Sequence, residues 1–226
     1  MTDAVMGHGP FELIVFDFDG TLCDSADVKT GAFYDLYLDD YGPRFAAAVR
    51  EYHLANAGIS RYDKIRYVER DFIGSDPDEH RVEQVALRFS QLVEQAVVDA
   101  PLFDGVIEFL STGSHRAPLA IASATPSDEL RRITDRKGIS QFFEAIEGSP
   151  RSKAEILAAY ASRFAIDPRQ VAMVGDQPSD ADGARAAGTD GLMIAPPPAP
   201  WTAPFERVDD FGAVAEWLNG RMSGRS

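Results

Sequence analysis

Three short apolar runs, each ending at a polar residue, constrain the fold of this chain more than any other feature. They cover residues 11–16, 117–122 and 170–174, they end at Asp17, Ser123 and Gly175-Asp176, and a weaker run covers 191–195. Helical periodicity separates and follows them at 126–137, 152–164 and 178–187. Strands that alternate with helices predict a parallel sheet with right-handed crossovers. Because ligands bind beyond the carboxyl ends of such strands, we expect Asp17, Ser123 and Asp176 to converge on one site.

The long interval between the first and second runs has a different pattern. It lacks a comparable strand, and helical periodicity at 25–41, 44–57, 61–73 and 78–98 is broken at Gly42-Pro43, Gly58 and Asp76-Pro77. We interpret the interval as a helical insertion, residues 25–99, in an α/β core formed by residues 1–24 and 100–226. A proline-rich tail at 196–204 precedes a terminal helix at 211–218.

The net charge of the chain is -14 at pH 7. Such a field repels nucleic acid and acidic membrane surfaces, so we expect neither as a partner. The single cysteine, Cys23, cannot form an internal disulfide, no apolar run approaches the roughly 18 residues of a membrane span, and no segment resembles a secretory leader. We therefore expect a cytoplasmic protein.

A site for an anionic phosphate ester needs a bound cation and basic groups nearby. The chain has four lysines that could supply such a group, Lys29, Lys64, Lys137 and Lys153.

Two carboxylates lie two positions apart at the end of the first run, in Asp17-Phe18-Asp19-Gly20-Thr21. Since alternate strand residues face the same side, both carboxylates point to one side if the extended backbone continues. This arrangement suits a covalent route in which Asp17 attacks phosphorus, while Asp19 protonates the departing oxygen and later activates water. Taken alone, the same run is also typical of an acidic turn that uses Gly20 for a positive dihedral angle.

The run from Asp17 to Ser25 resembles the first signature of the haloacid dehalogenase superfamily of phosphohydrolases. Ser123 is similar in position to the second motif and Lys153 to the third, and the segment from Gly175 to Asp180 resembles the acidic fourth motif. The insertion lies where that superfamily carries a helical cap of the C1 type, as in its phosphoglycolate phosphatase and β-phosphoglucomutase branch. The resemblance implies a Rossmann-like parallel sheet with helices on both faces, an inserted α-helical cap and hydrolysis of a small phosphorylated metabolite.

The resemblance also implies a role for each matching residue. Mg2+ would be held by the Asp17 carboxylate, the Asp19 main-chain carbonyl and Asp176. Asp180 would act through a water molecule, or else only cap its helix. The implied phosphate-binding positions are Gly20, Ser123, Ala124 and Lys153, and Lys153 would neutralise charge on Asp17 and the transferring phosphoryl group. The segment Thr125-Pro126-Ser127-Asp128 predicts a helix start beside this site, with Thr125 as the cap.

The choice of substrate would depend on the cap. Gly58-Ile59-Ser60-Arg61 resembles a loop that sugar-phosphate mutases of the superfamily use to contact the polar end of their ligand. Arg61 suits bidentate contacts with oxyanions, and Lys29 and Lys64 are further candidates for contact with the substrate. For all three the alternative is a solvated position on a charged helix. We expect His53 to be a surface or cap-core histidine.

Other functions are compatible with these residues. A phosphomutase shares the phospho-aspartate, and only kinetics separates it from a hydrolase. Dehalogenation is disfavoured because resemblance to its enzymes would require a non-acidic residue in place of Asp19, whereas phosphonate cleavage needs an imine-forming lysine, for which Lys29 and Lys64 are candidates. A receiver-like signalling module or a noncatalytic phosphate-binding protein belongs to another class, but receiver modules lack the long helical insertion. The sequence identifies neither the substrate nor the oligomeric state.

Overall fold

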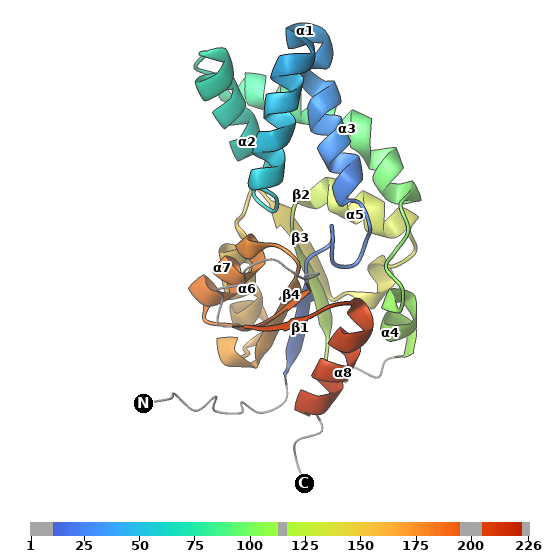
Figure 1. Cartoon of the computed structure of the whole chain (residues 1–226). Coiled ribbons are helices and arrows are strands. Elements are labelled where there is room, and N and C mark those ends of the chain that lie inside the picture. Colours follow the sequence, from blue (N-terminus) through green and yellow to red (C-terminus); the bar gives the residue numbers. More distant parts are fainter. Residues whose placement is uncertain (1–10, 113–116, 195–204, 223–226) are drawn as a thin grey trace.

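The computed structural model describes residues 11–112, 117–194 and 205–222. Its core is a six-stranded parallel sheet in the order β3-β2-β1-β4-β5-β6 (Figure 1). The strands are β1 (Leu13–Phe16), β2 (Leu119–Pro126), β3 (Ala145–Ser149), β4 (Val171–Gly175), β5 (Asp190–Ile194) and β6 (Glu206–Val208). β1 pairs with both β2 and β4, so Phe16 lies beside Ile121 and Val174. The residues that follow these three strands therefore meet at one edge of the sheet.

Helices cover both faces of the sheet. The core helices are α4 (Val106–Thr112), α5 (Ser127–Arg136), α6 (Lys153–Phe164), α7 (Pro178–Ala187) and α8 (Phe211–Met222), with short 3-10 turns η2 (Ser140–Phe142) and η3 (Pro168–Gln170). Phe16 of β1 shares one buried cluster with Phe109 and Phe211, whereas Val15 shares the other with Ile156. Burial on both faces explains why the central strands are continuously apolar. The predicted fold class is confirmed.

Two strands, β3 and β6, were not predicted from the sequence. The predicted strands correspond to β1, β2, β4 and β5, although β2 continues past its predicted end to Pro126. β3 and β6 lie at the two edges of the sheet. β3 contains Glu147 and Gly148, and β6 has three residues, so neither has the apolar run that reveals a buried strand. The tail predicted at 196–204 falls outside the described residues.

The insertion folds into helices that lie beyond the carboxyl ends of the central strands (Figure 1). They are α1 (Ala26–Ala55), α2 (Arg61–Tyr67), its π-helical continuation η1 (Val68–Ile73) and α3 (Glu79–Asp99). The break predicted at Gly42-Pro43 is a kink within α1, where Gly42 has a φ angle of 79°. Phe33, Ile65 and Phe89 are buried between these helices. We call residues 25–99 the cap, and these boundaries stay a prediction.

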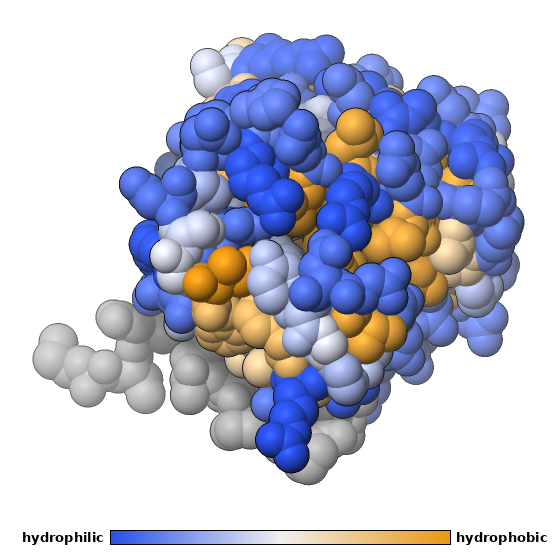
Figure 2. Space-filling model, turned by 90° about the horizontal axis from the view of Figure 1, so that it is seen from above, coloured by the Kyte–Doolittle hydropathy of each residue, from blue (hydrophilic) through white to orange (hydrophobic). Residues whose placement is uncertain are grey.

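The surface seen from above is mainly hydrophilic, with hydrophobic residues in separate patches (Figure 2). The exposed large apolar side chains of the cap include Tyr41, Leu54 and Phe72. None of the described helices has the length and apolar character that crossing a membrane requires. Three buried polar residues of the cap, His53, Arg61 and Lys64, instead line a cavity together with residues of the core.

Candidate active site

Asp17 follows β1 directly and lies at the centre of the carboxyl edge of the sheet. Its side chain is 5% exposed. Oδ1 accepts a hydrogen bond from the backbone N–H of Phe18 at 2.7 Å, and Oδ2 accepts one from Lys153 Nζ at 2.7 Å. Burial raises the pKa of Asp17 to about 8, with repulsion from Asp180 and Asp176 added and attraction to Lys153 opposing it. Asp17 is thus buried and fixed through both oxygens.

Two further carboxylates approach Asp17 from β4 and α7. One oxygen from each of Asp17, Asp176 and Asp180 lies within 4.8 Å of the others. Gly20 permits this approach, because it has a φ angle of 83° and a side-chain carbon there would collide with the Asp176 carboxylate. The N–H of Gly20 donates to the carbonyl oxygen of Cys23 at 2.8 Å. In this conformation Gly20 makes room for Asp176 and its N–H bonds Cys23, and the predicted contact of Gly20 with phosphate stays a prediction.

This acidic cluster fits a hard divalent cation. Burial, followed by repulsion from Asp180, raises the pKa of Asp176 to about 6, as burial also raises that of Asp17. Burial is the largest cause of both shifts, and repulsion between the carboxylates of the cluster adds to it. Carboxylate oxygens are the ligands that Mg2+ prefers. Asp17 and Asp176 therefore suit direct contact with such an ion.

Asp180 caps its helix, which was one of the two alternatives, and also bonds Lys153, while its contact with a metal through water stays a prediction. Its Oδ2 accepts a hydrogen bond from the backbone N–H of Gln177 at 2.9 Å, which completes a capping box at the start of α7. Its Oδ1 accepts a hydrogen bond from Lys153 Nζ, and the residue is fully buried. Burial lowers the pKa of Lys153, but attraction to Asp17 and Asp180 outweighs burial and raises it. Lys153 therefore stays charged between the two carboxylates.

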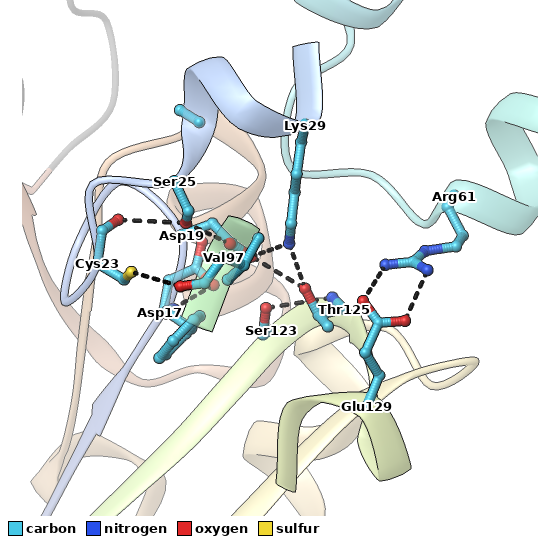
Figure 3. A network of polar contacts seen from close by, with 12 residues as sticks. Asp17, Asp19, Cys23, Ser25, Lys29, Arg61, Val97, Ser123, Thr125 and Glu129 are labelled. Atoms are coloured by element: carbon cyan, nitrogen blue, oxygen red, sulfur yellow. Dashed lines mark hydrogen bonds and ion pairs between the residues drawn. The ribbon is translucent and has the colours of Figure 1, made fainter. Parts of the chain in front are cut away.

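Asp19 has a different environment, because three donors surround its carboxylate (Figure 3). Ser25 Oγ donates to Oδ1 at 2.6 Å, while Lys29 Nζ and Thr125 Oγ1, the latter at 2.9 Å, donate to Oδ2. Burial alone would raise the pKa of Asp19, but the charge of Lys29 and the hydrogen bonds of all three donors lower it. These contacts favour the ionised form of Asp19, and Lys29 joins the cap to the core.

Thr125 does not cap α5 as the sequence predicts. Because Pro126 pairs with Ser149 of β3, β2 stays extended through Pro126 and α5 begins at Ser127. Pro126 occupies the N-cap position and forms no side-chain capping bond. Thr125 Oγ1 instead accepts a hydrogen bond from Lys29 at 2.6 Å and donates one to Asp19. The hydroxyl belongs to the site.

Most of the predicted site residues line two adjoining cavities between core and cap, whereas Gly20 and Asp176 line a third cavity beside Thr21 and Gln177. The first, of about 270 Å3, is lined by Asp17 and Asp19, and the second, of about 450 Å3, is lined by Lys153. Both cavities are lined by Ser123 and Ala124 at the end of β2. The cap wall of the first cavity includes Lys29, His53, Arg61 and Lys64. The sequence thus identified residues from both walls of one site.

Arg61 reaches the cavity but is neutralised by a core residue (Figure 3). Its guanidinium bonds both carboxylate oxygens of Glu129 at 2.7 and 2.8 Å, and Ser90 Oγ at 2.6 Å. The side chains of Arg61 and Glu129 are 5% and 3% exposed. This buried ion pair connects the cap to α5, and the predicted contact of Arg61 with substrate stays a prediction.

The comparisons with known proteins agree with this geometry. Residues 11–188 match the family model described as haloacid dehalogenase-like hydrolase. This chain belongs to the haloacid dehalogenase-like hydrolases. The match includes the cap and all the site residues described above, so the resemblance inferred from the motifs is confirmed at the level of the family.

Related members of this family carry different names. Tyrosine-protein kinase PtkA of Mycobacterium tuberculosis is 32% identical over 198 residues, which are 83% of this chain and 63% of that protein. The chain thus spans less than two thirds of the length of that relative. Phosphoglycolate phosphatase of Caulobacter vibrioides is 28% identical over 200 residues, covering 80% of this chain and 78% of the phosphatase. The crystal structure of β-phosphoglucomutase from Clostridium difficile shares the fold, with a TM-score of 0.70, 18% identity and coverage of 93% and 98% of the two chains.

Some site residues of this haloacid dehalogenase-like hydrolase were missed from the sequence. Ser25 ends the recognised first motif, yet its hydrogen bond to Asp19 was not foreseen. Glu129 is followed by the buried Leu130, and a carboxylate on the apolar stripe of a helix was the signal for a buried ion pair. His53 is buried against Phe33, with 4.5 Å between ring centres, and it faces the cavity. Nothing in the sequence indicated that His53 faces the cavity, because its contact with Phe33 joins the two parts of α1 on either side of the kink at Gly42.

Proposed function

We propose that this haloacid dehalogenase-like hydrolase is a Mg2+-dependent phosphatase that hydrolyses a small phosphorylated metabolite through an aspartyl-phosphate on Asp17. The observation that supports it is that Asp17 and Asp19 line the same cavity in unlike surroundings. Asp17 lies beside Lys153 and the acidic cluster, whereas Asp19 is bonded to Lys29. One carboxylate is thus suited to covalent attack and the other to proton transfer.

In the first half of the reaction, a carboxylate oxygen of Asp17 forms a bond to phosphorus. The bond between phosphorus and the ester oxygen breaks, and its electron pair remains on that oxygen. The leaving oxygen takes a proton from the pair formed by Asp19 and Lys29, in which Lys29 donates a hydrogen bond to Asp19. The products of this half are the free alcohol and the aspartyl-phosphate.

In the second half, Asp19 removes a proton from water while the water oxygen attacks phosphorus. The bond between phosphorus and Asp17 breaks, which releases inorganic phosphate and restores the carboxylate. The proton gained by the pair of Asp19 and Lys29 replaces the one given to the alcohol. One ester and one water thus yield one alcohol and one phosphate.

Charge on the transferring group needs compensation throughout. We assign this to Lys153, to the hydroxyl of Ser123 and to the backbone N–H of Ala124. Bound Mg2+, held by Asp17, Asp176 and the carbonyl oxygen of Asp19, with Asp180 acting through water, would neutralise negative charge and polarise the phosphoryl group. The role of Lys153 is supported by its position, since it already bonds Asp17.

Transfer to an acceptor other than water is the second candidate. The names of the relatives include a mutase and a tyrosine-protein kinase, and an ionised Asp19 is suited to activate any hydroxyl that enters the cavity. A cavity of about 270 Å3 accommodates a small metabolite more readily than it accommodates a tyrosine side chain that is part of a polypeptide. If phosphoryl transfer to a second sugar oxygen or to a tyrosine peptide outpaced phosphate release, the hydrolase proposal would be wrong.

The test is release of inorganic phosphate from a panel of phosphorylated metabolites, with Mg2+ and with excess chelator. We expect activity to require the metal and to disappear in Asp17→Asn. The matched control is Asp128→Asn, which alters an exposed carboxylate paired with Arg131 on the surface of α5. Turnover that resists the chelator, or full activity in Asp17→Asn, would contradict the mechanism.

A further inference from the structure

Lys64 is a buried cation that has no carboxylate partner among the described residues. It lies in α2 of the cap and is 3% exposed. Its Nζ donates a hydrogen bond to Nδ1 of His53 at 3.1 Å and lies 5.5 Å from the centre of the Phe33 ring. Neither neighbour carries a negative charge. A buried ammonium without a counter-ion destabilises a fold, so a protein that keeps one requires an explanation.

His53 does not neutralise Lys64. Burial, followed by the charges of Lys64 and Lys29, lowers the pKa of His53 to about 3, so the imidazole is neutral at physiological pH. Nδ1 therefore accepts the hydrogen bond from Lys64, which assigns the ring hydrogen to Nε2. When Lys64 is protonated, the pair therefore presents a positive charge and one N–H donor.

The other cations near the cavity differ from Lys64 in this respect. Lys29 pairs with Asp19, Arg61 pairs with Glu129, and Lys153 pairs with two carboxylates of the acidic cluster. Burial, together with repulsion from Lys29 and Arg61, lowers the pKa of Lys64 to about 7. Unlike these three cations, Lys64 therefore has no carboxylate in direct contact among the described residues.

Lys64 and His53 line the same cavity as Asp17 and Asp19. We propose that they form a subsite for a second anionic group of the substrate, a carboxylate or a second phosphoryl group. This inference rests on the proposed function. The cavity, of about 270 Å3, is below the usual range for drug-sized ligands, so the two charged ends are joined by a short carbon chain. The substrate class is a small phosphate monoester with an acidic group at its other end.

A packing role for Lys64 explains these observations less well. The ammonium lies over Phe33, but a cation–π contact with one ring does not replace a counter-ion. An apolar side chain of similar length would fill the same space without burying a charge. A ligand that brings its own negative charge accounts for both the lysine and its cavity-facing position.

The test compares esters that differ at one end. 2-Phosphoglycolate carries a carboxylate where ethyl phosphate has a methyl group, and ethylene glycol bisphosphate carries a second phosphoryl group. We expect kcat/KM of the wild-type protein to be at least tenfold higher for one of the two acidic esters than for ethyl phosphate, which also identifies the acidic group. Equal kcat/KM for all three esters would overturn the proposal without any variant.

Lys64→Met keeps an unbranched side chain and removes the charge. We expect it to reduce the preference for the acidic ester over ethyl phosphate at least tenfold. The matched control is Arg66→Met, which removes an exposed positive charge from the same helix and should leave the preference unchanged. An equal loss on both esters in Lys64→Met, or an unchanged preference, would show that Lys64 is merely structural.

Binding separates this inference from the proposed function. In Asp17→Asn with Mg2+, calorimetry measures the affinity for 2-phosphoglycolate, ethylene glycol bisphosphate and ethyl phosphate without turnover, with and without Lys64→Met. A preference for an acidic ester that depends on Lys64 supports the subsite even if the wild-type protein hydrolyses none of the three esters. Absence of that preference overturns the subsite even if hydrolysis is rapid.

Discussion

Lys29 of the cap donates a hydrogen bond directly to the Asp19 carboxylate of the core. The side chains are 13% and 16% exposed, so the ion pair is shielded from most of the solvent. Lys29 lies in the first turns of α1, close to the point where the chain passes from core to cap. The position of the cap therefore determines whether Asp19, the proposed general acid and base, is paired with Lys29.

Lys29→Met should lower kcat about 100-fold, the usual contribution of a positioned acid or base. The physical reason is that Asp19 loses the charge and the hydrogen bond of Lys29, both of which lower the pKa of its carboxyl group. Steady-state kinetics on the best substrate measures the effect. Arg50→Met, which removes an exposed charge from the same helix, serves as the control and should retain activity. Equal kcat in the two variants would exclude Lys29 from proton transfer.

Thr125→Val should lower kcat about tenfold and the free energy of unfolding by about 1 kcal/mol, because one hydroxyl bonds both Lys29 and Asp19. The comparison is Thr30→Val, whose hydroxyl also lies at the cavity but bonds only the Ala26 carbonyl oxygen of its own helix. Kinetics and urea denaturation report the two effects separately. A loss of stability with unchanged kcat would restore a purely structural role for Thr125.

The case of Thr125 shows where sequence analysis succeeded and where it failed. Asp17, Ser123 and Asp176 were located correctly, because each follows an apolar run and parallel strands end at the same edge. Thr125 was misassigned because Thr-Pro-Ser-Asp is also a good helix start, and pairing of Pro126 with Ser149 overrides that local preference.

Contacts between different helices could not be predicted from the sequence for a related reason. The pairing of Arg61 with Glu129, and of Lys64 with His53, joins residues on different helices. Helical periodicity defines which face of one helix is buried, but it does not specify which residue of another helix faces it. The weak edge strand β3 was missed because Glu147 and Gly148 interrupt its apolar pattern.

Arg61→Met should reduce the free energy of unfolding by about 3–5 kcal/mol, because it leaves the buried carboxylate of Glu129 without a counter-ion. The double variant Arg61→Met with Glu129→Leu should recover most of that loss. Urea denaturation of the single and double variants measures the coupling. The exposed pair of Arg66 and Glu79 is the control, and Arg66→Met should cost less than about 1 kcal/mol. Additive losses at Arg61 and Glu129 would mean that the two side chains do not interact.

Gly58→Ala should lower kcat/KM at least tenfold, because a side-chain carbon at this position collides with Ser179 Oγ of α7 and keeps the cap from approaching the core. Gly58 also has a φ angle of 81°, so backbone strain alone should cost about 1–2 kcal/mol. Gly42→Ala separates the two effects, since Gly42 has a φ angle of 79° and open space around it. Both variants should lose stability, and Gly58→Ala alone should lose activity. Parallel losses of activity would indicate strain, not contact with α7.

Lys64→Met should raise the free energy of unfolding by about 1–4 kcal/mol at pH 6.5, because it removes a buried charge without a counter-ion. The gain should depend on pH in a defined direction. The charged groups that act on Lys64 are Lys29, Arg61, Asp19 and Lys153, with His53 neutral, and burial is the largest cause that lowers the pKa of Lys64 to about 7. Between pH 7 and the pKa of about 10.4 of an unperturbed lysine, the unfolded chain binds the proton that the folded chain has lost.

Wild-type stability should therefore rise relative to Lys64→Met across that range, so that the two proteins converge above it. Urea denaturation at several pH values between 6.5 and 10.5 provides the measurement. Arg66→Met should show no such convergence, since Arg66 stays charged throughout and lies at the surface. A constant difference between wild type and Lys64→Met at all pH values would mean that the lysine is solvated in the folded protein. It would then have no buried charge to offer a second anionic group.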